Sequence, residues 1–529
     1  MTEPIEWVFD KLPPSMARRG GDPASHAFRQ NVATFVREVI QNANDQATGN
    51  PEVHFRFVEL TGSALDDFKT SIAWESLEPH LRAAAESKGG KNLEQFLDEL
   101  ERNKRLVLLH LEDRYTVGLT GDELSGDSHF RALCKDTLYS HKQSHGAGGS
   151  YGLGKSVLWA FSGLSTVLFN SNLSEHPPNV ESPRLFGRVE LPSHAVKESA
   201  QAGDYSGTGW FGRRVDAGEG TRAESVWGET AARLTRQQFL GRSEVTGTSL
   251  LIVGFRDPTT DDDANPDELA REIRAATVRE FWPAIAMPGR PLVVWTATAH
   301  GGNPIGDKDL GEVQPFVDCY RGRENDRDTL DEPGDVVVRE IPIEVPARRD
   351  GVRATRGHVR LCVRLASESS PGPWAGYVAW FRRAGMVIRY WDRRSLAAGA
   401  RPFHAVLACG EARDPERPTP QDEDVERFLR AAEPPGHDDW MTTASLKAEY
   451  KQGYAKALEQ LKRRVSEELK ALVVPRPRQG AVGPDRLRKR FPIGRQGSPG
   501  SAPSLFHFSK LTARFDGARW QFAGVVQPS

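Results

Sequence analysis

The sequence predicts an α+β protein of several domains, and three observations carry this prediction. The chain has 529 residues, which is more than one core holds and is typical of roughly three or four domains. Segments with apolar residues at three- and four-residue steps, which indicate helices, are interspersed with short alternating or compact apolar segments, which indicate strands. Charged residues make up 27% and hydrophobic residues 38% of the chain, as in ordinary globular proteins.

Composition also excludes several classes of protein. Lys and Arg number 70 and Asp and Glu 72, which gives a net charge of −2. This near-neutral balance argues against a protein that coats nucleic acid through bulk positive charge. The longest apolar runs fall far short of the roughly 20 residues of a spanning helix, and the first residues lack a signal-peptide pattern. We therefore expect a cytoplasmic protein without membrane association. Four widely spaced cysteines predict buried, reduced thiols: Cys134, Cys319, Cys362 and Cys409.

The first predicted unit follows a polar arm, residues 1–28, and extends to residue 255. Its apolar periodicity predicts a helix over 29–47, and residues 64–103 also read as helical. Between them, and after them, lie alternating or compact apolar segments typical of strands. A polar loop over 116–149 separates the second strand segment, 105–111, from a further helix. The expected strands are 53–60, 105–111, 165–169, 185–189 and 248–254, and the further helix is 151–161.

A second predicted unit spans 266–440, and a third part spans 441–529. The second unit opens with a helix over 268–281 and contains a loop at 415–422. Its expected strands are 292–296, 336–345, 358–365 and 376–391. The third part begins with one long amphipathic helix, 444–473, followed by a Pro-, Gly- and Arg-rich linker, 475–503, and two strands, 504–515 and 520–526.

The glycine-rich segment GGSYGLGKS is the first candidate site. Gly149, four residues and then Gly154-Lys155-Ser156 satisfy the P-loop pattern. A P-loop also needs a hydrophobic strand before it, whereas the preceding LYSHKQSHGAG is polar. A P-loop and a glycine-rich turn without a ligand both stay open as alternatives. A third interpretation brings in two other segments.

On the first helix, Glu38, Asn42 and Asp45 stand at i, i+4 and i+7 and therefore share one face. A carboxylate one turn from an amide suits water activation beside Mg²⁺, because the amide oxygen is a hard ligand. Taken alone, this pattern is more often a solvated polar face.

A carboxylate at the end of a strand is the other segment. In LLHLEDRYTVGLTG an apolar strand delivers Asp113, which can accept a hydrogen bond from an adenine amino group. Gly118 and Gly121 would let the backbone approach the base. Alone, this is an ordinary exit from a strand, but the order of the three segments is much more specific than any one of them.

In this order of motifs the chain resembles the GHKL ATPase superfamily, which includes gyrase B, the ninety-kilodalton heat-shock chaperones, MutL and sensor histidine kinases. The resemblance covers about residues 30–255. It implies that Glu38 is the general base, Asn42 the magnesium ligand and Asp113 the residue that reads adenine. Asp45 would lie beside the nucleotide, and Thr248 would support the adenine contact.

The resemblance also implies that the glycine-rich segment receives the phosphates of ATP and that residues 116–148 form a lid. One departure concerns the adenine loop, where the family usually reads Asp-x-Gly-x-Gly but Asp113 is followed here by Arg-Tyr-Thr-Val. The implied phosphate-binding residues are Gly148, Gly149, Tyr151, Gly152, Leu153, Gly154, Lys155 and Ser156.

The implied architecture is a Bergerat-type ATP-binding α/β sandwich, a transducer-like α/β domain and a helical C-terminal part. A transducer sends a basic side chain to the γ-phosphate, and the candidates here are Arg382, Arg383, Arg389 and Arg430. Surface arginines of a hairpin and of a helix are the alternative interpretation of these four. Which of them would sense the phosphate stays open.

From this resemblance we expect the protein to be a Mg²⁺-dependent ATPase that acts as an ATP-gated homodimeric clamp. Stand-alone MutL-like chains imply a role in defence against phage, with a nuclease or helicase partner. The basic stretch 476–495 could contact DNA, although a solvated linker is the simpler interpretation. The alternatives are a chaperone-like ATPase with a protein client, a P-loop ATPase using Gly149–Ser156, and a pseudo-enzyme that binds ATP without hydrolysing it.

Overall fold

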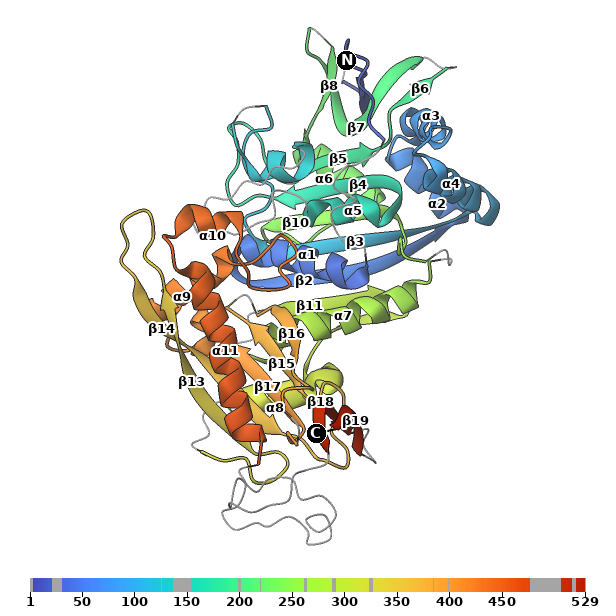
Figure 1. Cartoon of the computed structure of the whole chain (residues 1–529). Coiled ribbons are helices and arrows are strands. Elements are labelled where there is room, and N and C mark those ends of the chain that lie inside the picture. The colour runs from blue at the N-terminus through green and yellow to red at the C-terminus, as the bar shows by residue number, and fades with distance from the viewer. Residues whose placement is uncertain are drawn as a thin grey trace, which may run out of the picture.

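Figure 1 shows the computed structural model of the chain. The part that the structure describes comprises residues 3–20, 31–124, 126–136, 154–197, 201–218, 220–260, 264–287, 292–322, 327–383, 385–397, 399–475, 506–515 and 520–528. The predicted α+β class is confirmed, because one large sheet and one smaller sheet are both covered by helices.

The large sheet has 12 strands, whose main path runs β1-β7-β5-β4-β10-β3-β2-β11-β12. Neighbouring strands pair antiparallel, except that β11 pairs parallel with β2. Three short strands extend the path, since β6 and β8 pair with β7, and β9 pairs with β5. The bounds are β1 Ile5–Lys11, β2 Ala47–Thr61, β3 Arg105–Thr116, β4 Ser162–Asn172, β5 Arg184–Glu190, β6 His194–Val196, β7 Gly203–Asp216, β8 Thr221–Glu224, β9 Val226–Trp227, β10 Gly247–Phe255, β11 Val293–Thr298 and β12 Gly301–Pro304.

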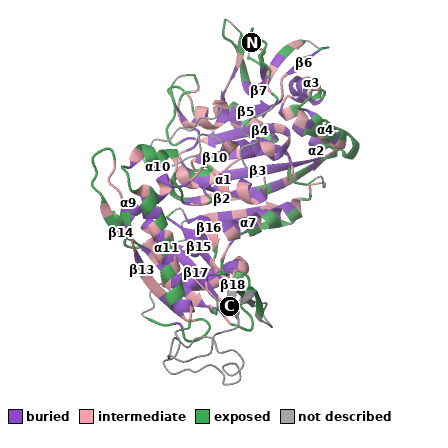
Figure 2. Cartoon of the chain, in the orientation of Figure 1, coloured by how far each residue is buried: buried purple, intermediate pink, exposed green. Residues whose placement is uncertain are grey.

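Helices cover both faces of this sheet because its strands alternate apolar residues toward each face. One core lies under α1, α5 and α7, and the other under α2, α3, α4 and α6. Figure 2 shows the buried residues along the strands of this sheet. The bounds are α1 Val32–Asp45, α2 Gly62–Ser71, α3 Trp74–Ala85, α4 Lys91–Asn103, α5 Val157–Ala160, α6 Gly228–Gln237 and α7 Pro266–Ala286.

The second sheet has five strands in the order β13-β14-β17-β15-β16. Helices α8, α9 and α11 pack on it, and its core is continuous with the core under α1. A separate hairpin, β18 with β19, follows. The bounds are β13 Val336–Val345, β14 Thr355–Leu365, β15 Tyr377–Phe381, β16 Val387–Asp392, β17 Phe403–Ala408, α8 Gln314–Arg321, α9 Pro420–Ala431, α10 Ala444–Glu449, α11 Tyr454–Val473, β18 Phe506–Phe515 and β19 Trp520–Pro528.

Several predicted elements differ from those observed. The prediction of a single helix over 444–473 is wrong: α10 and α11 are separate, and Gly453 takes a φ of +114° between them. The expected strand 376–391 is the β15–β16 hairpin, and the helical stretch 64–103 is three helices. The loop at 415–422 already contains the start of α9, which Thr419 caps by accepting from the Asp422 N–H.

Other elements were not predicted at all: β1, β6, β7, β8, β9, β12, β17, α6 and α8. Four glycines interrupt the apolar alternation of β7, and β6, β8, β9 and β12 have four residues or fewer. The helix expected over 151–161 is a 3₁₀ turn over 154–156 followed by the four residues of α5, while 151–153 lie outside the described residues.

The four cysteines are buried and free, as predicted. Burial raises the pKa of the Cys134 thiol to about 12, which keeps it protonated and unreactive at neutral pH. In the part of the chain that the structure describes, no helix is both long and apolar enough to cross a bilayer.

Candidate functional site

Helix α1 carries the first residues of the candidate site. It begins after Asn31, whose side-chain oxygen accepts the Thr34 N–H at 2.9 Å, and its Phe35 ring packs on Phe161 with ring centroids 4.7 Å apart. These contacts place Glu38 on a buried side of the helix, with 7% of its surface exposed. One turn later, Asn42 is exposed. The sequence pattern thus yields a buried carboxylate beside an open amide.

The Glu38 carboxylate lies directly against Gly154, which follows it by 116 residues. A Cβ atom at Gly154 would overlap Glu38 Oε2, so any residue other than glycine would displace the carboxylate. Lys155 Nζ donates to the carbonyl oxygens of Ala132 and Asp136, and the latter contact is 2.5 Å. Ser156 is buried. The described end of the glycine-rich segment therefore meets the polar face of α1.

The remaining members of that segment lie outside the described residues: Gly148, Gly149, Tyr151, Gly152 and Leu153. The residues directly before Gly149, where a P-loop would require a strand, also lie outside the described residues. Part of the predicted lid is described, and it is packed against the domain rather than free. Phe130 and Cys134 are fully buried, and the guanidinium of Arg184 stacks 3.4 Å from the Phe130 ring centroid.

Asp113 lies at the end of β3, in a row of polar residues across three neighbouring strands. On β10, next to β3, the Thr248 N–H donates to Asp113 Oδ1 at 2.8 Å, and Ser171 on β4 pairs in register with Thr248. Thr116 Oγ1 donates to the same oxygen at 2.5 Å. Both of these hydrogen bonds use Oδ1, and Oδ2 is the second acceptor atom of the carboxylate. Burial raises the pKa of Asp113 above its usual range, while Arg242 and these two hydrogen bonds oppose the rise.

The loop after Asp113 connects this row to the C-terminal end of α1. The Val117 N–H donates to the Gln46 carbonyl at 3.0 Å, and the Leu119 N–H donates to Ser171 Oγ at 2.8 Å. Gly118 has a φ of +73°, and a Cβ there would lie 2.6 Å from the Asn172 carbonyl oxygen. Gly121 has a φ of +90° and packs against Ser128. Both predicted glycines therefore occupy positions that exclude a side chain.

Tyr115 stands where the family motif has its first glycine. Its φ is +60°, in the left-handed region, although it is not glycine. Two backbone contacts hold it there: its N–H donates to the Thr246 carbonyl, and its own carbonyl accepts from Thr48 Oγ1, both at 3.0 Å. The backbone conformation that the motif normally obtains from glycine is thus kept by a tyrosine.

The four candidate arginines occupy different environments. Arg430 on α9 reaches α1, where its Nη2 lies 3.2 Å from Asp45 Oδ1. Arg382 is 5% exposed and is bound on both sides by carboxylates, with Nη1 2.8 Å from Glu426 and Nε 2.5 Å from Glu433.

The other two candidates are paired close to the surface. Arg383 forms an ion pair with Glu411, and Arg389 pairs with Asp439 at 2.5 Å. Of the four, Arg430 is therefore the one in contact with the helix of the candidate site.

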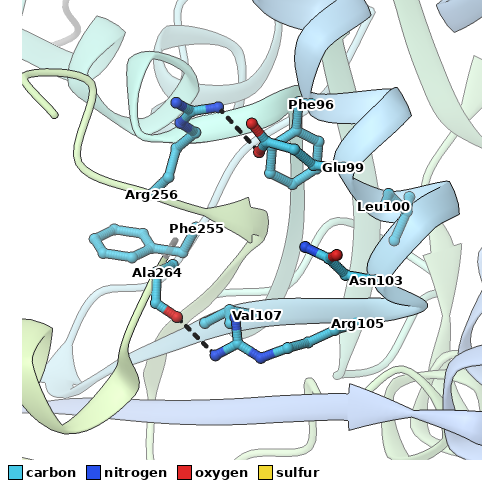
Figure 3. Close-up of a pocket in the computed structure, with 9 residues that line it drawn as sticks. All are labelled: Phe96, Glu99, Leu100, Asn103, Arg105, Val107, Phe255, Arg256 and Ala264. Atoms are coloured by element: carbon cyan, nitrogen blue, oxygen red, sulfur yellow. Dashed lines mark hydrogen bonds and ion pairs between the residues drawn. The ribbon is translucent and has the colours of Figure 1, made fainter. Parts of the chain in front are cut away.

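A surface pocket elsewhere in the molecule involves none of these residues. It is lined at the beginning of β3, the end of α4 and the end of β10, where Arg256 faces Glu99 and Arg105 donates to the Ala264 carbonyl at 2.6 Å (Figure 3). Asp113 lies at the other end of β3, about 25 Å away along a strand that rises 3.3 Å per residue.

Among the described residues, no three His, Cys, Asp or Glu side chains are grouped so as to hold a metal. Mg²⁺ bound with a nucleotide does not require such a group, because phosphates and waters supply most of its ligands. The exposed Asn42 amide beside Glu38 fits this mode of binding.

Sequence reasoning missed several residues that shape the site. Thr116, three residues after Asp113, could have been found from that spacing. Ser171 and Gly247 carry no local signal, yet Ser171 Oγ donates to the Gly247 carbonyl at 2.7 Å, beside Asp113. Arg242 donates to the Asp113 carbonyl at 3.0 Å, a contact between residues 129 apart.

Comparison with known proteins finds several similar solved structures. No protein-family model and no curated protein matches the chain. The similar solved structures include the 43K ATPase domain of Thermus thermophilus gyrase B in complex with an aminocoumarin, at 12% identity over 83% of this chain and 87% of that chain, with a TM-score of 0.29.

Two further structures have similar scores. The N-terminal domain of a DNA repair protein is 9% identical over 85% of this chain and 97% of that chain, with a TM-score of 0.32. The topoisomerase IV ATP-binding domain of Francisella tularensis, in complex with a small-molecule inhibitor, is 10% identical over 88% and 98%, also with a TM-score of 0.32. At these TM-scores the likeness gives no correspondence between residues.

Proposed function

We propose that the protein is a Mg²⁺-dependent ATPase of the GHKL type that works as a conformational switch. The observation that carries this proposal is the meeting of three distant segments along α1. Glu38 lies against Gly154, and Asn42 is exposed one turn later on the same helix. In the loop after Asp113, the Val117 N–H donates a hydrogen bond to the Gln46 carbonyl at the end of the helix. These are the three motifs on which the superfamily resemblance rests.

In the proposed site each residue has one chemical task. Asp113 Oδ2 accepts a hydrogen bond from the adenine amino group, while Thr248 and Thr116 fix the carboxylate through Oδ1. Asn42 holds Mg²⁺, which neutralises the charge of the phosphates when bound. Glu38 accepts a proton from the attacking water. Gly154 leaves space for that carboxylate, and Asp45 keeps Arg430 near the site.

The wider role is proposed from the resemblance alone. ATP binding would close a homodimeric clamp, with a nuclease or helicase as partner in a cytoplasmic defence system, and hydrolysis would reopen it. DNA contact through 476–495 concerns residues outside those described. A chaperone-like ATPase with a protein client is the alternative role.

Nucleotide binding separates this site from a P-loop. We expect Asp113→Asn to weaken ATP binding at least tenfold, because an amide offers an N–H where the adenine amino group needs an acceptor. Asp66→Asn, an exposed carboxylate on α2, is the matched control and should bind ATP like the parental protein. Isothermal titration with ATP and Mg²⁺ measures both. Loss of binding in Lys155→Ala with normal binding in Asp113→Asn would favour the P-loop alternative.

A further inference from the structure

Helix α1 has a third face, which contacts the second unit rather than the core or the candidate site. Arg37, Gln41 and Asp45 recur at four-residue steps and therefore lie along one side of the helix. Arg37 Nη1 pairs with Glu280 on α7 at 2.6 Å, and its Nη2 donates to the His437 carbonyl. Asp45 pairs with Arg430 at the far end of this face, as described above.

Gln41, at the centre of this face, makes the most buried of these contacts. It is 8% exposed, and its Nε2 lies 3.0 Å from His437 Nε2. His437 Nδ1 lies 2.8 Å from Glu433 Oε2, and a carboxylate can only accept, so Nδ1 carries a proton. In the neutral imidazole, His437 Nε2 is then the acceptor for the Gln41 amide N–H. In the described part of the chain, Gln41 Oε1 is buried without a hydrogen bond, so the imidazole is the anchor of this side chain.

His437 is itself held rigidly. Glu433 is fully buried and accepts from Arg382 through both Nε at 2.5 Å and Nη2 at 2.9 Å, and from Trp440 Nε1 at 3.3 Å. Burial would raise the pKa of Glu433, but Arg382 and His437 outweigh it and lower the pKa to about 2. The carboxylate that orients the imidazole is therefore charged throughout the neutral range. His437 also has a φ of +48°, which its neighbours must maintain.

We propose that Gln41 and His437 are positioning residues through which the second unit sets the position of Glu38. Gln41 lies within one turn of both Glu38 and Asn42, and a helix moves as a rigid body over one turn. A shift of about 1 Å in a catalytic group is enough to slow a reaction about a hundredfold. The Gln41–His437 contact fixes α1 against Gly154. This inference rests on the proposed ATPase function.

The test removes the contact from each side. Gln41→Leu and His437→Phe should each lower kcat for ATP hydrolysis at least tenfold, with the Kd for ATP changed less than about twofold. The double variant should be no slower than the slower single variant, because both changes break the same contact. His80→Leu, which disrupts a buried histidine pair away from α1, is the control for general destabilisation and should retain the parental kcat below its unfolding temperature.

Two conservative variants separate positioning from folding. His437→Asn keeps an N–H near the place of Nδ1. Compared with His437→Phe, it should regain thermal stability but should not regain kcat. His437→Gln places its amide near Nε2 and should restore part of kcat. Parental kcat in Gln41→Leu or His437→Phe, or simple multiplication of their effects in the double variant, would overturn the inference.

A second measurement does not depend on turnover. Hydrogen–deuterium exchange of the amides in α1 should increase at least tenfold in His437→Phe, while α4 on the opposite face of the sheet keeps its parental rate. Unchanged exchange in α1 would also overturn the inference. If the parental protein fails to hydrolyse ATP, the proposed function fails, and the exchange result still decides whether His437 holds α1.

Discussion

Tyr115 shows how one residue can keep a backbone conformation that its side chain disfavours. A non-glycine residue in the left-handed region costs roughly 1–2 kcal/mol, and here backbone contacts on both sides maintain it beside Asp113. The tyrosine side chain is 42% exposed, so packing contributes little that would offset this cost.

Substitution at Tyr115 should reveal this strain. We expect Tyr115→Gly to have a free energy of unfolding about 1 kcal/mol higher than that of Tyr115→Ala, because both lose the ring and only glycine relieves the backbone. Urea denaturation of the two variants measures the difference. An alanine variant as stable as the glycine variant would show that the backbone at this position is not strained.

His80 and His194 form a buried pair that ties the N-terminal strand to the domain. Their ring nitrogens lie 2.9 Å apart, and the Phe9 ring stacks on His80 with centroids 3.6 Å apart. Burial, and to a lesser extent the neighbouring His194, lowers the pKa of His80 to about 3; burial also lowers the pKa of His194. Both rings are therefore neutral in the folded protein at neutral pH.

Acid should destabilise the protein through this pair. The unfolded chain takes up protons on these residues below about pH 6.5, whereas the folded His80 does so only near pH 3. The free energy of unfolding should therefore fall as the pH drops from 7 to 5, by up to about 1.4 kcal/mol per pH unit for each histidine. His80→Leu should remove part of this slope in urea titrations at several pH values. An unchanged slope would mean that His80 is not the group responsible.

At the residue scale, local spacing predicted the helix face with Glu38 and Asn42 and the strand end with Asp113. It could not predict Ser171 or the Gln41–His437 contact, because these depend on which strands and helices become neighbours. The role of each predicted residue in ATP chemistry stays a prediction. The arginines show the same limit, since only the fold distinguishes Arg430 at α1 from Arg382 in its buried carboxylate pair.

At the scale of elements, apolar periodicity predicted long helices better than their ends. Residues 444–473 carry one apolar stripe, but the chain leaves the helix after Glu449 and starts α11 at Tyr454. Tertiary contacts cause the break, since Arg348 and Tyr450 form an antiparallel β-bridge. The Lys451 N–H also donates to the Ala347 carbonyl at 2.8 Å. No feature of the stripe itself predicts this.

Gly453 makes the break possible, and its replacement should be costly. Its φ of +114° and ψ of −15° are disfavoured for any residue with a Cβ, although there is space for one. We expect Gly453→Ala to lower the free energy of unfolding by about 1–3 kcal/mol. Gly311→Ala, in open space with an ordinary φ, is the matched control and should change stability by less than about 0.5 kcal/mol. Equal stability of the two variants would argue against the strain.

At the scale of the whole molecule, the chain couples its units through α1 and the edge of the large sheet. The elements that open the predicted second unit belong to this contact, because α7 packs on α1 and β11 pairs parallel with β2. Such pairing joins Val293 to Glu52 across 241 residues, and a local pattern carries no information about it. The division of the chain into units at 255 and 266 stays a prediction.

The central claim is that Glu38 drives hydrolysis of ATP in the site along α1. Single-turnover hydrolysis with Mg²⁺ tests it most directly, with Glu94→Ala, an exposed glutamate on α4, as the matched control. Glu38→Ala should bind ATP within about twofold of the parental protein and hydrolyse it at least a hundredfold more slowly, as expected for loss of a general base. Removal of Mg²⁺ should abolish hydrolysis in all forms. Hydrolysis by Glu38→Ala at the parental rate would contradict the account.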